Sequence, residues 1–275
     1  MNETTNKIIE ILLEAGNIAK YYFQNEDNLV QTKLDKSHVS SADKEINNFI
    51  CKQINEIDDK FEILSEEDTA ENQLKSISGE TFFIIDPIDG TSSYIQGSKQ
   101  FTINISYINN HKLCFSAICI PFENEIYFAD KNDTYLHKNY AGENNVKISR
   151  LKKVNYKEKK IINVITTKRK DEIDKIKFFL KKSKKNLNFN SMSSAKKFCS
   201  LAIGENDIYI RKAKIKIWDI IAGFHITNNL GFIIEDFHGN NIYENISKKE
   251  YLKKISYDSF RINEFIIRPA RLEIP

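Results

Sequence analysis

The chain has 275 residues, of which 41% are hydrophobic and 29% are charged, as is typical of a globular protein that buries a sizeable core. Its 41 basic residues nearly balance its 38 acidic ones, and the net charge of +3 gives no support to a nucleic acid polymer as partner. No apolar run is long enough for a transmembrane segment, and the N-terminus lacks the pattern of a signal peptide. We therefore expect a cytoplasmic protein, with peripheral association with the inner membrane left open.

Four cysteines are scattered along the chain without a CxxC pair. This spacing supports neither a disulfide framework nor a zinc site, so we expect reduced, partly buried thiols. The four are Cys51, Cys114, Cys119 and Cys199.

Two amphipathic helices are predicted at the start of the chain. Apolar residues recur at helical spacing over 4–24 and again over 42–56, and the polar segment 31–42 is predicted to be a loop. The rest of the first half contains short apolar runs typical of strands, including a hairpin. The predicted strands cover residues 61–64, 81–85, 101–108, 113–120 and 124–130.

The second half alternates strands with helices after a lysine-rich segment at 150–160, which is predicted to be a linker. Such alternation favours an α/β layered sandwich. We expect a single domain over 1–275, with an N-terminal α+β half of about 1–150 and a C-terminal α/β half of about 151–275. The predicted strands cover 161–166, 207–211, 231–235 and 263–268, and the predicted helices cover 171–183, 194–203 and 218–229.

Carboxylates are predicted to gather where strands end. Glu66 follows the first predicted strand and Asp86 follows the second. Asp89 comes shortly afterwards, and Asp219 lies at the start of a late helix. Mg²⁺ prefers hard oxygen ligands, and carboxylates this close together would repel one another without a cation. Each cluster alone is also ordinary turn or capping chemistry, but the three together favour a metal site.

The segment Asp86-Pro87-Ile88-Asp89-Gly90-Thr91 is the most informative of these clusters. A tight turn there can direct both aspartates and the Ile88 carbonyl at one point. Pro87 fixes its own backbone angle and lacks an N–H that would compete for the carboxylates. Gly90 permits backbone conformations that other residues resist, and the N–H groups after it could hold a phosphate group.

These segments resemble the lithium-sensitive inositol monophosphatase superfamily, which carries DPxDGT and a later WDxxAG. The second motif is matched by Trp218-Asp219-Ile220-Ile221-Ala222-Gly223. Within the superfamily, the chain is most similar to the bacterial 3'(2'),5'-bisphosphate nucleotidases, through the segments Lys33–Asp43, Leu64–Asp68 and Ala195–Cys199. The resemblance runs from about residue 8 to residue 268 and implies a five-layer αβαβα sandwich, as a monomer or a homodimer.

The resemblance also implies a role for each site residue. Two or three Mg²⁺ ions would be held by Glu66, Asp86, the Ile88 carbonyl, Asp89 and Asp219. Asp43 and Thr91 would orient and deprotonate the attacking water, with Glu66 and Asp89 completing the catalytic set. The phosphomonoester would contact Gly90, Thr91, Ser92, Lys197 and Asp219, while Glu67 would lie behind the metal ligands. Inhibition by Li⁺ is implied in the same way.

Among the departures from the nucleotidase pattern, which include His38 and Ser40 in the loop before Asp43 and Leu230 before the last strand pair, four others leave the substrate pocket open to question. Ser193 and Ala195 replace a glycine and a serine ahead of Lys197. Ile215 and Ile217 replace polar residues shortly before the second motif. The two isoleucines could form apolar walls that suit an adenine face better than a polyhydroxylated ring.

The intact acidic set favours a Mg²⁺-dependent phosphatase acting on a small soluble phosphomonoester. Adenosine 3',5'-bisphosphate, which would give AMP and phosphate, is the expected substrate, because Lys33 and Lys36 could pair with its second phosphate. An inositol-1-phosphatase or a broad sugar phosphatase is the alternative among enzymes. A catalytically weak relative with a regulatory or binding role is the alternative from another class of protein.

Overall fold

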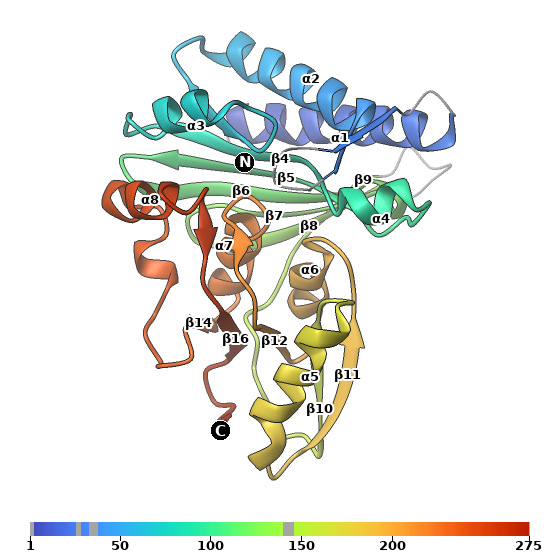
Figure 1. Ribbon diagram of the computed structural model, residues 1–275, viewed down its shortest axis with the longest axis vertical. Helices are drawn as coiled ribbons and strands as arrows, with labels where there is room; N and C mark the ends of the chain where they lie inside the picture. Colours follow the sequence, from blue (N-terminus) through green and yellow to red (C-terminus); the bar gives the residue numbers. More distant parts are fainter. Residues whose placement is uncertain (1–2, 26–28, 33–37, 140–145, 275) are drawn as a thin grey trace.

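The structure is a computed structural model that describes residues 3–25, 29–32, 38–139 and 146–274. Two large β-sheets alternate with layers of helices (Figure 1), which confirms the predicted layered α/β sandwich. Within these residues, no helix is both long and apolar enough to cross a membrane. All four cysteines have free thiols.

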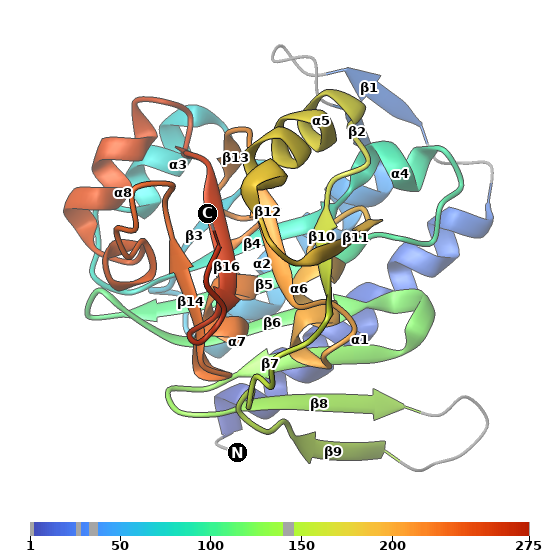
Figure 2. The same ribbon diagram turned by 90° about the horizontal axis from the view of Figure 1, so that it is seen from below.

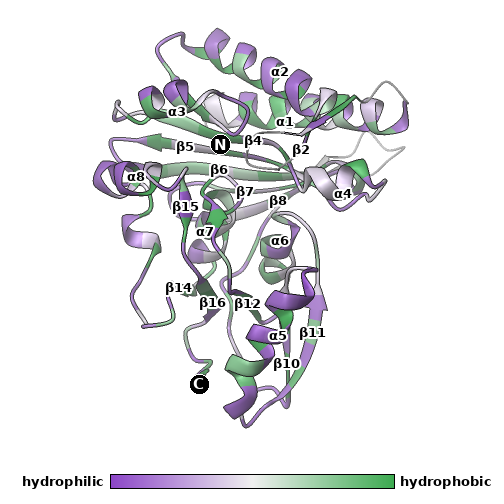
Figure 3. Cartoon of the chain, viewed as in Figure 1, coloured by the Kyte–Doolittle hydropathy of each residue, from purple (hydrophilic) through white to green (hydrophobic). Residues whose placement is uncertain are grey.

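The main helices form three layers around the two sheets (Figures 1 and 2). One outer layer consists of α1 (Glu3–Gln24) and α2 (Ser41–Ile57). The middle layer, between the sheets, consists of α6 (Lys196–Ala202) and α7 (Ile221–Asn229), and α5 (Lys170–Phe179) covers the far side of the second sheet. Figure 3 shows hydrophilic and hydrophobic residues alternating along α2 and α5, as expected for helices with one buried face.

The first sheet has seven strands: β3 (Glu62–Ser65), β4 (Phe82–Asp89), β5 (Thr102–Asn109), β6 (Lys112–Ile120), β7 (Glu125–Ala129), β8 (Thr134–Asn139) and β9 (Val146–Arg150). They pair in sequence order, and only β3 and β4 run parallel. Figure 2 shows β8 and β9 at the edge beyond β7. The sequence patterns predict neither of these two, because at least half of their residues are polar or charged.

The second sheet has five strands: β10 (Ile161–Thr166), β11 (Asn186–Ser191), β12 (Ile208–Arg211), β14 (Phe232–Glu235) and β16 (Phe265–Pro269). Their order is β11-β10-β12-β16-β14, with β10 parallel to both of its neighbours. The four strands predicted in this half are present. Strand β11 is not predicted, because it has only two apolar residues and because asparagine, which provides three of its six residues, is depleted in strands.

The segment predicted as a loop at 31–42 contains two short strands and the start of α2, so that prediction is wrong in part. β1 (Val30–Thr32) and β2 (His38–Ser40) pair antiparallel, and each is too short to show an alternating pattern. The remaining elements are α3 (Ala70–Ser76), α4 (Thr91–Ile95), α8 (Lys249–Ser256), β13 (Ile215–Lys216), β15 (Arg261–Ile262) and the 3₁₀ turns η1 (Pro121–Glu123), η2 (Leu180–Lys182) and η3 (Tyr243–Asn245).

Strand β4, which lies next to the edge strand β3 of the first sheet, carries the first acidic motif. Asp86 lies opposite Asn104 of β5, and Asp89 lies opposite Thr102. Three steps along β4 therefore match two steps along β5, which is a β-bulge. Pro87 lies within the bulge, where its missing N–H removes no regular ladder bond. Bulges re-aim side chains, and this one lies between the two aspartates of the motif.

Helices α6 and α7 pack unusually closely between the two sheets. A Cβ atom on Gly223 of α7 would lie 2.1 Å from Cγ of Phe198 on α6. The Phe198 ring is 1% exposed and therefore has no room to move away. Only glycine fits at position 223, which gives a packing reason for the glycine that ends the second motif.

We expect Gly223→Ala to destabilise the protein by about 3 kcal/mol, because overpacking of this severity forces the helices apart. Urea unfolding of the two proteins measures the difference. Gly79→Ala is the matched control, since the nearest atom to an added Cβ there is 3.8 Å away. Equal stability of Gly223→Ala and wild type would contradict the described packing.

Candidate active site

Three carboxylates meet at the carboxyl ends of β3 and β4 and at the turn before α7. Glu66 follows β3, and its backbone N–H donates to the Ile85 carbonyl of β4 at 3.3 Å, which brings it beside Asp86. Asp219 comes from the other half of the chain, in the turn just before α7. One carboxylate oxygen from each of Glu66, Asp86 and Asp219 lies within 4.8 Å of the other two. Oxygens arranged in this way can hold a divalent cation.

Asp86 is the most constrained of these acids. It is 1% exposed, and neither of its carboxylate oxygens has a hydrogen-bond partner among the described residues. Burial raises the pKa of Asp86 well above its usual range, and the charges of Glu66, Asp89 and Asp219 raise it further. A buried carboxylate without a partner is unfavourable, and a bound cation would supply the missing interactions. The residues present therefore fit a Mg²⁺ site.

Asp89 lies beyond the bulge of β4 and has different neighbours. The Nδ2 group of Asn104 donates to its Oδ2 at 3.4 Å. Burial raises the pKa of Asp89, while the ammonium group of Lys197 and the backbone N–H of Ala195 oppose that rise. Burial also raises the pKa of Asp219 well above its usual range, and the charge of Asp89 adds to that effect. The two aspartates, from different halves of the chain, therefore share one electrostatic environment.

Thr91 connects the turn after β4 to helix α2. Its Oγ1 lies 2.9 Å from the Ile88 carbonyl oxygen and 3.2 Å from Oδ1 of Asp43, and it can donate to either. Asp43 belongs to the capping box of α2, in which its Oδ2 accepts the backbone N–H of Ser40 at 2.8 Å and the Ser40 hydroxyl at 2.6 Å. This cap fixes the Asp43 carboxylate, so that its second oxygen is held beside Thr91.

Gly90 precedes the short helix α4 with a φ of 91°, a left-handed conformation that glycine adopts most readily. A Cβ there would also lie 3.3 Å from Cβ of Ser194. Thr91 and the exposed Ser92 form the first turn of α4, where the helix itself offers no acceptors for backbone N–H groups. The turn therefore presents hydrogen-bond donors close to the acids.

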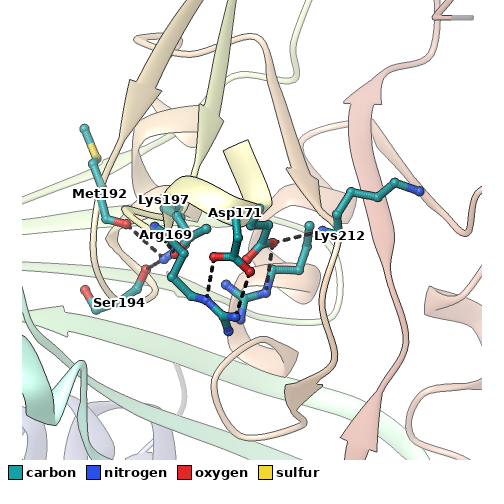
Figure 4. Close-up of polar contacts among 9 residues, drawn as sticks. Arg169, Asp171, Met192, Ser194, Lys197 and Lys212 are labelled. Atoms are coloured by element: carbon teal, nitrogen blue, oxygen red, sulfur yellow. Dashed lines mark hydrogen bonds and ion pairs between the residues drawn. The ribbon is translucent and has the colours of Figure 1, made fainter. Parts of the chain in front are cut away.

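Lys197 is a buried cation at the start of α6, and it is 6% exposed. Its Nζ donates to the carbonyl oxygens of Ser194 at 2.5 Å and Met192 at 3.4 Å (Figure 4). Nζ also lies 5.7 Å from the centre of the Tyr209 ring. Burial lowers the pKa of Lys197 to about 8, against the opposing effect of Asp89. The structure thus places Lys197 within electrostatic reach of the acids.

Arg211 is a second cation near the acids, and it is not among the site residues predicted from the sequence. It ends strand β12, and 13% of its side chain is exposed. Its charge opposes the rise in the pKa values of Asp89 and Asp219 that burial causes. Its Nε lies 3.5 Å from Oε1 of Glu172 on α5. The signal available in the sequence was a charged residue at the end of an otherwise apolar run.

A sequence profile of the inositol monophosphatase family matches residues 1–259. The chain belongs to this family. It is therefore a phosphatase of a metal-dependent family, in keeping with the cluster around Asp86.

Named relatives carry more than one function. The 3'(2'),5'-bisphosphate nucleotidase CysQ of Buchnera aphidicola is 25% identical over 245 residues, which cover 89% of this chain and 88% of the relative. The Nus factor SuhB of Pasteurella multocida is 26% identical over 250 residues and covers 88% of both chains. The crystal structure of CysQ from Bacteroides thetaiotaomicron superposes with a TM-score of 0.73, at 22% identity and with 98% of each chain covered. That last similarity supports the fold.

The departures at Ser193 and Ala195 lie where the two halves of this inositol monophosphatase family member meet. The Ser193 hydroxyl lies 2.6 Å from the Ser93 hydroxyl of α4. Ser194, with a φ of 56°, packs against Gly90. Ala195 is buried at the start of α6, and its backbone N–H acts on Asp89. In this chain the segment therefore joins the phosphate-binding turn expected in the family to α6.

Two expectations about the substrate pocket change. Ile217 is fully buried in the core between the sheets, so the predicted apolar wall is wrong at this position. Ile215 lies in β13 and packs, partly buried, against the same core. Lys33 and Lys36, which were expected to meet a second phosphate, lie outside the described residues.

We expect Mg²⁺ to raise the melting temperature of the metal-free protein, and to raise it more at about pH 8 than at about pH 5.5. The raised pKa values of Asp86, Asp89 and Asp219 mean that protons compete with the cation on the acid side. Without Mg²⁺, the contribution of these acids to stability changes with pH in the opposite direction. These acids hold protons longer in the folded chain than in the unfolded chain, so their contribution to stability falls as pH rises through the raised pKa values.

Thermal unfolding of protein dialysed against EDTA, with and without MgCl₂ at each pH, checks this expectation. NaCl at matched ionic strength is the control. A larger Mg²⁺ effect at the acidic pH would show that these carboxylates are not the binding groups.

Proposed function

We propose that the chain is a Mg²⁺-dependent phosphomonoesterase whose substrate is a 3'(2'),5'-bisphosphate nucleotide, with adenosine 3',5'-bisphosphate as the leading example. The observation that carries the proposal is Asp86, a buried carboxylate with no hydrogen-bond partner among the described residues, set among Glu66, Asp89 and Asp219. Such a cluster is unfavourable as a purely structural element and favourable as a binding site for hard cations. The expected products are AMP and phosphate.

Different residues of the chain would bind the metal ions, accept the proton and bind the phosphate during hydrolysis. Two or three Mg²⁺ ions would lower the pKa of a bound water and offset charge on the phosphoryl group, with ligands from Glu66, Asp86, the Ile88 carbonyl, Asp89 and Asp219. When the Thr91 hydroxyl donates to Asp43 and not to the Ile88 carbonyl, its oxygen can accept a hydrogen bond from the water, and its own proton can pass to Asp43 as the water proton moves to Thr91. Asp43 is the base that can receive this proton. The N–H groups after Gly90 and the Ser92 hydroxyl would hold the phosphate.

Two buried cations support a substrate with a second phosphate. Lys197 and Arg211 both oppose the rise in the pKa of Asp89 that burial causes, so both lie within electrostatic reach of the proposed metal site. The metal ions and the turn after Gly90 would already balance one phosphate. An ammonium and a guanidinium beyond them would suit another anion. The similarity to the Buchnera nucleotidase supports the same choice.

Other functions compete with this proposal. An inositol-1-phosphatase or a broad sugar phosphatase would use the same acids and would not need a second cation. A regulatory or binding role is favoured by the similarity to a relative named as a Nus factor. Measurable Mg²⁺-dependent phosphate release would count against a purely regulatory role. Inhibition by Li⁺, the number of ions, the monomeric or dimeric state and a cytoplasmic location stay predictions.

A phosphate-release panel tests the substrate. We expect kcat/KM for adenosine 3',5'-bisphosphate to exceed that for inositol-1-phosphate by about tenfold or more, equivalent to about 1.4 kcal/mol. Fructose-1,6-bisphosphate is the control, because it carries two phosphates without a nucleoside. An equal or higher value for inositol-1-phosphate would overturn the nucleotidase assignment and leave the phosphatase assignment in place.

We expect Asp89→Asn to lower kcat by at least about 100-fold while leaving the fold intact. The change removes one charge from a proposed metal ligand at nearly constant volume, and Asn104 can still pair with the amide oxygen. Steady-state assays at saturating Mg²⁺, with melting curves as the check on folding, measure the effect. A variant that kept a tenth of the wild-type kcat would show that Asp89 is not a shared metal ligand.

We expect Thr91→Ala to lower kcat by about 10²- to 10⁴-fold with little change in substrate affinity, because its hydroxyl would position water and not substrate. Thr91→Ser, which keeps the hydroxyl, should retain most of the activity. Comparison of kcat and KM for both variants decides between the two roles. A change confined to KM would make Thr91 a binding residue.

A further inference from the structure

Glu172 is a buried carboxylate that the proposed mechanism does not use. It lies in the first turn of α5 and is 1% exposed. Its Oε1 accepts the backbone N–H of Lys212 at 2.9 Å and lies 3.5 Å from Nε of Arg211. Its Oε2 has no hydrogen-bond partner among the described residues. Burying a charge in this way is unfavourable unless a nearby cation compensates for it, and Arg211 is the residue with which it forms an ion pair.

Arg211 is subject to negative charge from two sources. Its Nε lies 3.5 Å from Oε1 of Glu172 on α5, and burial lowers its pKa, while Tyr209, Glu172, Asp219 and Asp89 together raise it. In the working enzyme, metal ions would neutralise much of the charge on Asp89 and Asp219. Glu172 would then remain as the acid that holds the arginine. A long, flexible arginine loses rotamer entropy when it is fixed, so a carboxylate that fixes it in advance strengthens binding.

We propose that Glu172 is a positioning residue for substrate selection, which holds the Arg211 guanidinium in place for the second phosphate group of a bisphosphate substrate. The proposal rests on the proposed function, because it assigns Arg211 to a phosphate that is not hydrolysed. Glu172 itself touches neither the substrate nor the metal ions. It acts from the far side of the second sheet, through the end of β12.

The first test is Glu172→Gln, which keeps the size of the side chain and an oxygen that can accept the Lys212 N–H, but removes the charge. We expect KM for adenosine 3',5'-bisphosphate to rise by about tenfold while kcat stays within about twofold. KM for inositol-1-phosphate, which has a single phosphate, should also stay within about twofold. A purely structural role would lower stability or kcat for both substrates alike.

The matched control is Glu264→Gln. Glu264 pairs with the neighbouring Lys212 at 3.0 Å, and its side chain is 43% exposed. The control therefore removes one negative charge near the same strand end without touching Arg211. It should leave KM and kcat for both substrates at wild-type values.

The decisive measurement is the coupling between Glu172 and Arg211. Arg211→Gln alone should raise KM for the bisphosphate, and adding Glu172→Gln in that background should change KM by less than about twofold. An equal effect of Glu172→Gln in both backgrounds, a loss confined to kcat, or no effect of Arg211→Gln on KM would each overturn the proposal.

Two further comparisons separate a failure of the positioning role from misfolding of the variant and from a failure of the proposed function. If Glu172→Gln does not show a cooperative melting transition, Glu172→Asp replaces it, since aspartate keeps the charge but withdraws it from Arg211. The proposed function is judged separately, from the wild-type ratio of kcat/KM for the two substrates. If wild type prefers inositol-1-phosphate, the nucleotide assignment fails, whereas the positioning role is judged from the Glu172–Arg211 coupling in KM for adenosine 3',5'-bisphosphate, and an absence of that coupling overturns it.

Discussion

The mutual repulsion of several buried carboxylates is the constraint on which the site depends. Asp86 has no hydrogen-bond partner among the described residues, and burial together with the charges of its neighbours raises its pKa well above the usual range. Part of this charge is offset by Lys197 and Arg211, both from the second half of the chain. Bound metal ions would neutralise the negative charge that remains. One half therefore supplies most of the acids and the other supplies both cations, so that neither half forms a balanced site alone.

The sequence is informative where a local pattern carries the signal. The apolar run before Asp86 predicts a buried strand, and β4 is that strand. The strands β8, β9 and β11 escape prediction, because at least half of the residues in each are polar or charged and the apolar positions are few. Arg211 and Ile217 show a second limit on what can be predicted from the sequence. Whether a charged residue at a strand end faces the acids, or an isoleucine faces a pocket, is decided by packing between distant segments, which no local pattern reports.

Part of the contact between the halves lies beside the expected phosphate-binding turn. Ser193 meets Ser93 through their hydroxyl groups, and Ser194 packs against Gly90. The capping box of α2 fixes the carboxylate of Asp43, which comes from a third segment of the chain. Residues that are remote in sequence are thus held by short, directional contacts, and these contacts turn a set of acids at strand ends into a defined site. This explains why spacing along the chain indicates the chemistry but not the shape of the pocket.

The contact between Phe198 and Gly223 has a consequence for how such a protein can change over evolutionary time. Lys197 adjoins Phe198, and Asp219 lies four residues before Gly223 in the turn that precedes α7, so the packing of Phe198 on Gly223 links the positions of a cation and an acid of the site. Drift in the packing of these helices would disturb both charges at once. New substrate ranges would therefore arise by exchanging residues in the connecting segments, such as Ser193 and Ala195, while the helix pair is inherited unchanged.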